Sequence, residues 1–260
     1  MSLKDSIQQD SGTDLIFQKL GETSTEKALD VATGEGVFIR SLMKTLKQYD
    51  SFIGIDTSQK RIDQASRMFK KDVAQFVKMN AEALEFNDNS FDLVSISESL
   101  HHIKDPIQVL KEIKRVLTPE GAFILQESFS DEDQKKSRLS DVLIHEFIAK
   151  NDVLRGYYHR KFYTRQELID MVEKSGFSIH EIFISQIPLK CALCKYLDYC
   201  NDSMSKRMIN KGLREISASL NKLKEFPQYP DIKIQATALR KEIRNNGYSP
   251  ASVIFIVAKE

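Results

Sequence analysis

Polar side chains recur in this sequence at the ends of short apolar runs, where they could bind one ligand together. They are Asp30, Asp56, Asn80 and the pair Ser97-Glu98. If each apolar run is a strand of one parallel sheet, these residues meet at the carboxyl edge of that sheet. In open α/β sheets this edge is where ligands bind.

The spacing of these residues suggests what they could bind. Asp56 lies 20 residues after Gly36, which suits a carboxylate that accepts hydrogen bonds from both hydroxyls of a ribose. The tripeptide Asn80-Ala81-Glu82 can offer an amide and a backbone N–H to the edge of an adenine ring. Each residue also has a plainer interpretation, because Asp30 could cap the following turn and Asp56 could be the N-cap of the next helix.

The segment from Lys27 to Phe38, KALDVATGEGVF, predicts a strand, a turn and the start of a helix around Asp30. Its apolar run is typical of a parallel strand with both faces buried. Gly34 and Gly36 then allow a sharp turn and leave no side chain between the turn and a ligand. Residues 37–46 have helical spacing, so the turn leads into a helix N-terminus, where unpaired N–H groups favour an electron-rich ligand.

Strand-like and helix-like segments alternate after this turn. Strands are expected at 28–31, 51–55, 74–79, 91–96 and 122–126, and helices at 37–46, 59–70 and 106–116. Thr118-Pro119-Glu120-Gly121 is a turn signal before the fifth strand. Such alternation predicts an α/β fold, a doubly wound and mostly parallel sheet with helices on both faces.

The pattern changes after residue 127. Helices are expected at 131–148 and 165–174, and strands at 177–187 and 252–258. Between these last strands, residues 188–250 contain two apolar repeats with four-three spacing, which predict two amphipathic helices. We therefore expect one domain from residues 1–187 and 251–260, with 188–250 as a helical insertion that acts as a lid, an acceptor-binding element or an oligomer contact.

Four sequence segments in this order resemble the class I S-adenosylmethionine-dependent methyltransferases, in the branch of ubiquinone- and menaquinone-biosynthesis enzymes. They are LDVATGEG, GIDTS, NAEALEFNDNSFDLVSISESLHHIKDP and LKEIKRVLTPEGAFIL, within about residues 26–127. The resemblance implies a Rossmann-like sheet of seven strands and a methyltransferase that uses S-adenosyl-L-methionine. Nicotinamide-dependent dehydrogenases share the first turn, but their fingerprint is Gly-x-Gly-x-x-Gly. Here Gly36 is followed by Val37, Phe38 and Ile39, so the third glycine of that fingerprint is missing.

The resemblance also assigns cofactor-binding residues. Asp30 and the turn Ala32-Thr33-Gly34-Glu35-Gly36 would hold the methionine part, with Ser97 contacting it through its backbone. Asp56 and Thr57 would bind the ribose, and Asn80, Ala81 and Glu82 the adenine. Ala32 stands where the family often has glycine, and Asn80 where it often has aspartate; neither change removes the site.

Candidates for a general base follow the fourth strand. They are Glu98, His101 and His102. Histidine is the side chain that titrates near neutral pH without perturbation, so it suits proton removal from a hydroxyl or ammonium acceptor. The pair His101-His102 is also widespread in the branch, and either histidine could serve only for packing or capping.

An aromatic and basic cluster, YYHRKFY at residues 157–163, precedes the helix at 165–174. In relatives this region passes over the acceptor pocket, so we expect Tyr158, His159, Arg160 and Tyr163 to bind the acceptor. Aromatic rings would favour a cation and the basic side chains an acid. The alternative is a solvated loop whose rings are buried in the core.

Three cysteines, Cys191, Cys194 and Cys200, raise the question of a metal. Cys-x-x-Cys suits zinc, but a full tetrahedral site needs four ligands. Helical spacing of Leu189, Leu193 and Cys200 instead indicates packing. We expect no metal ligands, with a metal or metalloid site as the alternative.

Composition limits the partners. The chain has 260 residues, a formal net charge of +1 and no run of about 20 apolar residues. We expect a cytoplasmic enzyme with a small-molecule methyl acceptor, no membrane span and no nucleic acid, and a homodimer through the helical insertion as one option. Because that insertion has 12 Lys/Arg against 6 Asp/Glu, tRNA or protein methylation is an alternative. A non-catalytic cofactor-binding partner or sensor is another.

Overall fold

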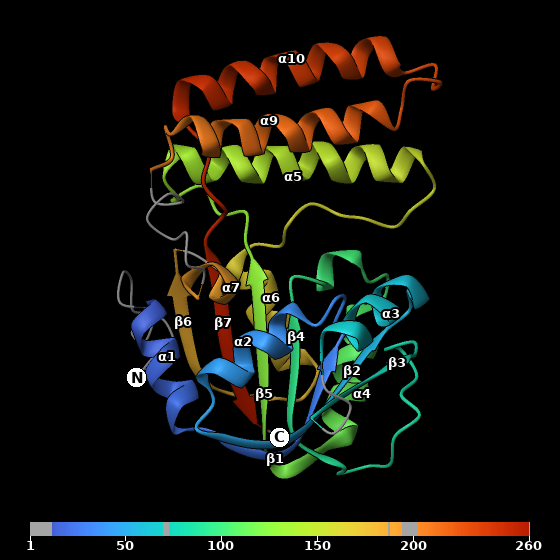
Figure 1. Ribbon diagram of the computed structural model, residues 1–260, viewed down its shortest axis with the longest axis vertical. Coiled ribbons are helices and arrows are strands. Elements are labelled where there is room, and N and C mark those ends of the chain that lie inside the picture. The colour runs from blue at the N-terminus through green and yellow to red at the C-terminus, as the bar shows by residue number, and fades with distance from the viewer. Residues whose placement is uncertain (1–11, 70–72, 187, 194–201, 260) are drawn as a thin grey trace.

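The computed structural model describes residues 12–69, 73–186, 188–193 and 202–259. Seven strands form one sheet in the order β3-β2-β1-β4-β5-β7-β6 (Figure 1). The strands are β1 (Ser24–Val31), β2 (Gln48–Asp56), β3 (Ala74–Lys78), β4 (Phe91–Ser97), β5 (Leu117–Ser128), β6 (Ser178–Ser185) and β7 (Val253–Lys259). Pairs from β3 to β5 are parallel, and β7 runs antiparallel to both β5 and β6. The predicted fold class is confirmed.

The helices that accompany the sheet follow the predicted alternation. They are α1 (Gly12–Glu22), α2 (Val37–Thr45), α3 (Gln59–Met68), the short 3-10 helix η2 (Leu100–His102), α4 (Pro106–Val116), α6 (Arg165–Lys174) and α7 (Leu189–Ala192). Local sequence sets where several of them begin. Asp105 accepts a hydrogen bond from the N–H of Gln108 at the start of α4, and Thr164 and Glu167 form a capping box on α6.

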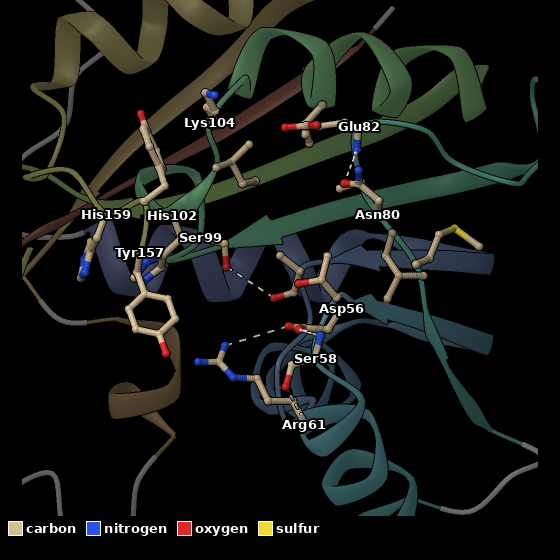
Figure 2. A pocket seen from close by; sticks show the side chains of 18 of the residues that line it. Asp56, Ser58, Arg61, Asn80, Glu82, Ser99, His102, Lys104, Tyr157 and His159 are labelled. Atoms are coloured by element: carbon tan, nitrogen blue, oxygen red, sulfur yellow. Dashed lines mark hydrogen bonds and ion pairs between the residues drawn. The ribbon is translucent and has the colours of Figure 1, made fainter. Parts of the chain in front are cut away.

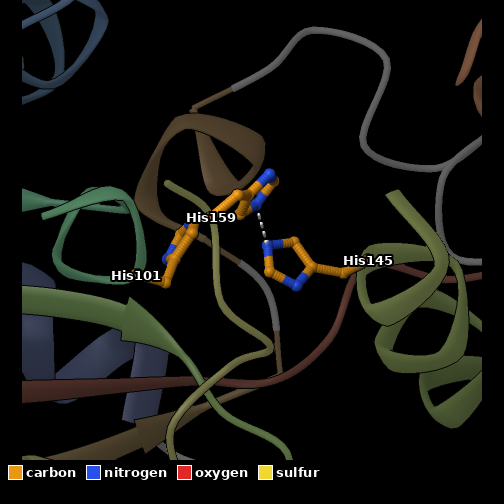
Figure 3. A group of neighbouring side chains, drawn as sticks. All are labelled: His101, His145 and His159. Carbon is orange, nitrogen blue, oxygen red and sulfur yellow. Dashed lines mark hydrogen bonds between the residues drawn. The ribbon is translucent and has the colours of Figure 1, made fainter. Parts of the chain in front are cut away.

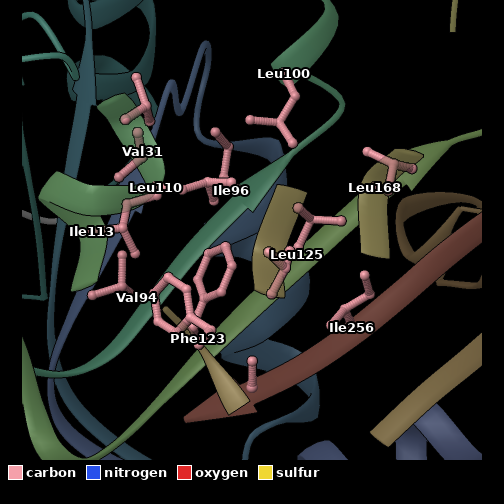
Figure 4. Packing of buried hydrophobic residues seen from close by; sticks show 14 of the residues in the cluster. Val31, Val94, Ile96, Leu100, Leu110, Ile113, Phe123, Leu125, Leu168 and Ile256 are labelled. Carbon is pink, nitrogen blue, oxygen red and sulfur yellow. The ribbon is translucent and has the colours of Figure 1, made fainter. Parts of the chain in front are cut away.

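Apolar side chains cover both faces of the sheet. On one face, branched residues of β1, β4, β5 and β7 pack against α4 and α6, as in the contact of Ile96 and Leu125 with Leu110 and Leu168 (Figure 4). On the other face, residues such as Phe38 and Leu42 of α2 cover the strands. Strands buried on both faces account for the continuous apolar runs in the sequence.

Three long helices form a separate layer beyond the carboxyl edge of the sheet (Figure 1). They are α5 (Lys136–Leu154), α9 (Lys206–Asn221) and α10 (Tyr229–Asn246). Ile144 and Phe147 of α5 share a core with Ile216 of α9 and Ala236 of α10. The helical layer, as we call α5, α9 and α10, therefore joins two stretches of chain that lie far apart in sequence.

Element bounds differ most from the sequence-based ones in two places. The helix expected at 131–148 instead spans Lys136–Leu154. The Pro-Gly turn at 118–121 lies inside β5, because β5 pairs with β4 at Leu117 and again at Ala122 across a register shift. A bulge accommodates the turn there, and the strand continues on either side of it.

Candidate functional site

The strand ends that carry the predicted site residues lie next to one another. Val31 of β1 pairs with Ile55 of β2 on one side and with Ile96 of β4 on the other. Asp56 and Ser97 each come one residue later, so both lie at the level of the turn that follows β1. Strands β2 and β3 are added on one side of β1, and β4 and β5 on the other. In such folds ligands bind at the point where the direction of strand addition changes.

A cavity of about 630 Å³ opens at this edge (Figure 2). Its floor consists of polar strand ends and apolar side chains, among them Asp56, Asn80, Met79 and Ile103. Its outer wall comes from the end of α5 and the following segment, through Asp152, Tyr157, Tyr158 and His159. The cavity therefore lies between the sheet edge and the helical layer.

Asp56 organises the turn beside it. One carboxylate oxygen accepts a hydrogen bond from the backbone N–H of Gly34 at 3.0 Å, and the other accepts one from the N–H of Ser58 at 2.8 Å. The N-cap of α3 is Ser58, so the plainer interpretation of Asp56 as that cap does not hold. Each carboxylate oxygen has a second lone pair available for a further donor.

A second cavity, of about 160 Å³, shares Ala32 with the first. Asp30, Thr33 and Ser97 line it. Asp30 is buried, and its Oδ1 accepts a hydrogen bond from Ser95 at 2.7 Å. Asp30 Oδ2 and Thr33 Oγ1 are buried without a partner in the part of the chain that the structure describes. Both oxygens can accept a hydrogen bond from a ligand in this cavity.

Burial has a clear effect on Asp30. Desolvation raises the pKa of its carboxyl from 3.8 to about 6, with the nearby Asp56 adding to the rise. A cation in the small cavity would oppose that rise and favour the ionised form. Asp30 accepts its hydrogen bond from Ser95 of β4 and not from the backbone of the turn. The plainer interpretation of Asp30 as a cap of that turn is therefore not supported.

The backbone of the turn is left-handed at three positions. Ala32, Gly34 and Gly36 have φ values of 54°, 56° and 74°. Ala32 adopts a conformation that glycine adopts freely, which fits the glycine often found there in the resembling family. A side chain at Gly36 would meet the ring of Phe69 at 2.7 Å. Gly36 is also the N-cap of α2 and supplies no side-chain bond, so α2 begins with amides that no cap satisfies.

The predicted cofactor-binding residues thus divide between the two cavities. Asp30, Ala32, Thr33 and Ser97 line the small one, and Ala32, Asp56, Thr57, Asn80, Ala81 and Glu82 line the large one. Gly34 and Gly36 shape the turn between them. Asn80 accepts a hydrogen bond from the N–H of Glu82 at 3.1 Å, which folds the tripeptide back toward the cavity.

The three candidate bases lie in different environments. Glu98 lines the small cavity with a left-handed φ of 50°, and its carboxylate accepts a hydrogen bond from Ser128 at 2.9 Å. Burial, followed by repulsion from Glu127, raises the pKa of Glu98 from 4.5 to about 7. His102 lines the large cavity. His101 is buried and lines neither of these two cavities, and its Nδ1 lies 3.1 Å from the Glu127 carboxylate.

The predicted acceptor-binding residues separate into two pairs. Tyr158 and His159 line the large cavity. Arg160 and Tyr163 are absent from its lining, which differs from the sequence expectation. Arg160 stacks on Tyr163 with 3.5 Å from its guanidinium carbon to the ring centroid, and Tyr163 is held next to Phe129 at the end of β5.

Several cavity residues carry no strong sequence signal. Arg61 of α3 and Lys104 add positive charge to the large cavity, and Lys190 of α7 lines the small one. Asp152 and Tyr157 also line the large cavity. Arg61 could have been found from the sequence, because the helix expected at 59–70 begins just after Asp56 and its first turn lies near that residue. Lys190 could not, because only the tertiary fold brings α7 to the small cavity.

Of the cysteines, Cys191 is half-buried in α7. Cys194 and Cys200 lie outside the described residues, so the cysteine hypothesis stays a prediction. In the described parts of the chain, no helix is both long enough and apolar enough to span a bilayer.

Comparison with known proteins agrees with this geometry. Residues 29–125 match the family model described as a methyltransferase domain. A demethylmenaquinone methyltransferase of Thermotoga maritima is 27% identical over 63% of this chain and 75% of its own length. One from Lactobacillus johnsonii is 36% identical over 41% of this chain and 45% of its own length, so this chain spans less than half of that relative.

A solved structure with a similar fold is described as a candidate methyltransferase from Bacillus halodurans. It has a TM-score of 0.58 at 18% identity and covers 96% of this chain and 99% of its own. The matched residues 29–125 include the end of β1, the glycine turn and all of β2 and β4. Residues 29–125 of this chain form a methyltransferase domain of the class I S-adenosylmethionine-dependent type.

Proposed function

We propose that this protein transfers the methyl group of S-adenosylmethionine to a small-molecule acceptor. The observation that carries the proposal is the pair of cavities joined at Ala32. One presents a buried, unpaired carboxylate oxygen, and the other presents the Asp56 carboxylate beside apolar walls. These features suit the two ends of the cofactor.

The small cavity suits the amino-acid end. Asp30 Oδ2 and Thr33 Oγ1 supply buried oxygens for an ammonium group. The first amides of α2, at Val37 and Phe38, would face a carboxylate, since both residues line this cavity and the cap of α2 supplies no side-chain bond. Ser97 would contribute through its backbone.

The large cavity suits the adenosine end. Asp56 would accept the ribose hydroxyls with its free lone pairs, with Thr57 beside it. Asn80, Ala81 and Glu82 would bind the adenine edge, and Met79 and Ile103 offer apolar surfaces to its faces. Arg61 Nη1 lies 4.0 Å from the Asp56 carboxylate and would help to hold that carboxylate in place.

The cofactor, when bound, supplies an electrophilic methyl group on a sulfonium. The chain contributes by orienting the acceptor and, for a hydroxyl or ammonium acceptor, by taking up a proton. Glu98, with a pKa of about 7, and His102 are the two candidate bases that line a cavity. Burial, followed by the neighbouring His101, lowers the pKa of His102 to about 3, so Glu98 is the better matched of the two to proton removal near neutral pH. Tyr158 and His159 would form the acceptor side.

We further propose that residues 188–250 form the part of the chain that adapts this common site to its acceptor. Together with α5, the helices α9 and α10 support the segment that carries Tyr158 and His159. An acceptor of the kind named for the relatives, demethylmenaquinone, is the first to test. A homodimer through the helical layer remains a secondary proposal.

Calorimetric titration with S-adenosylmethionine and S-adenosylhomocysteine is the first test. We expect micromolar binding of both, followed by transfer of radiolabelled methyl to an acceptor from a panel that includes demethylmenaquinone. Binding without turnover across a wide panel would support the sensor or partner alternative. Transfer to total RNA or to protein instead would support the macromolecular alternative, and no binding by folded protein would overturn the proposal.

A further inference from the structure

Four of the five histidines of this chain gather in one place. They are His101 and His102 of η2, His145 of α5, and His159 of the segment after α5, and His180 is the one outside the group. The ring centroids of His101 and His145 are 4.7 Å apart, and those of His145 and His159 are 4.8 Å apart. This cluster connects the sheet edge with the helical layer.

Three of these histidines present nitrogens to one another (Figure 3). His145 Nε2 lies 3.1 Å from His159 Nε2, and one ligand nitrogen from each of His101, His145 and His159 lies within 4.8 Å of the others. Two nitrogens around a tetrahedral zinc ion, each bonded at about 2.0–2.1 Å, are separated by roughly 3.3 Å. The His145–His159 pair is already at that spacing, and His101 needs a shift of roughly 1–2 Å.

A carboxylate holds the opposite nitrogen of two of these rings. His101 Nδ1 is 3.1 Å from Glu127, and His159 Nδ1 is 2.9 Å from Asp152. An Nδ1–H donated to a carboxylate fixes the tautomer, leaves the lone pair on Nε2 and makes the ring a stronger ligand. This carboxylate–histidine pairing is the usual support of metal-binding imidazoles.

His145 is the third member and has no such support. Its ring stacks on Phe162 with centroids 3.6 Å apart, and its Nδ1 is buried without a partner among the described residues.

We propose that His101, His145 and His159 form a binding site for a divalent transition-metal ion, with zinc as the preferred one. Imidazole nitrogens suit zinc, and three of them leave a fourth position for water or another ligand. His159 lines the large cavity, so that fourth position is next to the acceptor side. The ion would fasten α5 to the carboxyl edge of the sheet.

This site does not depend on the methyltransferase proposal, so it can be tested on protein without cofactor. Tag-free protein is dialysed against a chelator and titrated with zinc alone, with metal content measured by mass spectrometry. We expect one zinc per chain and a Tm rise of about 5 °C at a hundredfold excess of free zinc over Kd. No stoichiometric binding by folded wild-type protein would overturn the proposal.

Two histidine variants provide the matched comparison. His145→Ala removes a ligand and should weaken zinc binding about 100-fold, whereas His180→Ala, at an exposed position on β6, should leave it unchanged. Equal binding by both variants would overturn the proposal. If His145→Ala does not fold, His145→Gln provides the same test with a polar side chain of similar reach.

Cobalt distinguishes histidine ligands from the cysteines of residues 191–200. Cobalt(II) bound at the three histidines should give visible absorption bands without thiolate charge-transfer absorption in the near ultraviolet. Strong thiolate bands that disappear when Cys191, Cys194 and Cys200 are changed to Ser would place the metal at the cysteines and overturn the proposal.

Discussion

The sheet edge and the helical layer build the two sides of the large cavity in different ways. On the sheet side, site residues follow strand ends directly, and backbone groups fix them, as when Asp56 binds the N–H groups of Gly34 and Ser58. On the layer side, contacts between side chains add to the backbone ones, as between His159 and His145 or Asp152. A site held by backbone changes little with sequence, whereas one held by side chains can be altered one residue at a time.

This difference predicts separable functions. Cofactor affinity should depend on the sheet side, and acceptor use and stability of the outer wall should depend on the layer side. The experiments below either support that separation or contradict it.

The largest effect is expected from Asp56→Ala. The variant removes the carboxylate that would accept the ribose hydroxyls and leaves the N–H groups of Gly34 and Ser58 without their partner. S-adenosylhomocysteine should bind roughly 100-fold more weakly in calorimetry, as the loss of two charge-assisted hydrogen bonds implies. The control is Asp63→Ala at an exposed position of α3, and affinity equal to wild type in Asp56→Ala would refute the ribose assignment.

A core substitution in the helical layer tests the other region. Ile216 is fully buried in α9, so Ile216→Ala should lower the free energy of unfolding by about 2–4 kcal/mol. Ile234 of α10 is 70% exposed, and Ile234→Ala should change it by less than about 0.5 kcal/mol. Denaturant unfolding measures both. If Ile216→Ala also weakens cofactor binding strongly, the two regions are not separable.

The pH dependence of cofactor binding tests the small cavity. Asp30 has a raised pKa of about 6 in the free protein, and a bound ammonium group favours its ionised form. Affinity should therefore rise with pH through 6, with binding about tenfold weaker at pH 5 than at pH 7. Calorimetry in buffers of equal ionic strength would measure this, and Asp30→Asn should abolish the slope. A flat wild-type profile would mean that Asp30 does not meet the ammonium.

The same raised pKa makes a prediction for the free protein. Because the folded carboxyl is less acidic than the unfolded one, its contribution to stability is fully present below pH 3.8 and is lost as the pH rises through about 6. Asp30→Asn should therefore unfold at a higher denaturant concentration than wild type at pH 7, with the difference shrinking toward pH 4. An advantage that does not change with pH would exclude Asp30 titration as its cause.

The smallest effect is expected at the outer wall. Tyr158 lines the large cavity and is 46% exposed, so Tyr158→Ala should raise the KM for the acceptor about fivefold with cofactor Kd unchanged. Arg160→Ala is the comparison, since Arg160 is absent from the lining and contacts Tyr163 and Glu167 instead. If Arg160→Ala raises the KM for the acceptor more than Tyr158→Ala does, Arg160 belongs to the acceptor site after all.

The sequence predicted which residues lie at the carboxyl edge of the sheet because the determinants there are local. Asp30, Asp56 and Asn80 each belong to a short run that a strand and its following turn position without help from distant residues. The glycine turn imposes its backbone conformation from its own residues. Element type and site residues therefore follow from the same few positions.

The layer side was harder to predict because its contacts are long-range. His145 lies on a helix whose sequence gives no sign of what it faces, and it reaches His101 only when α5 packs over the sheet edge. Arg160 is basic, as expected for a residue that binds an acidic acceptor. In the structure it forms an ion pair with Glu167 and stacks on Tyr163 instead. The extent of α5 also differs from the prediction, and beyond residue 148 the buried Asn151 donates a hydrogen bond to Ser219 of α9.

The antiparallel direction of β7 has a consequence for how this protein could be altered. β6 ends and β7 begins at the same edge of the sheet, the edge that carries the cavities. Chain inserted between them must emerge over the ligand side, and it can change in length without shifting the register of any parallel strand. The hairpin is therefore a natural grafting position, at which a whole acceptor-facing segment can be exchanged while the cofactor site stays as it is.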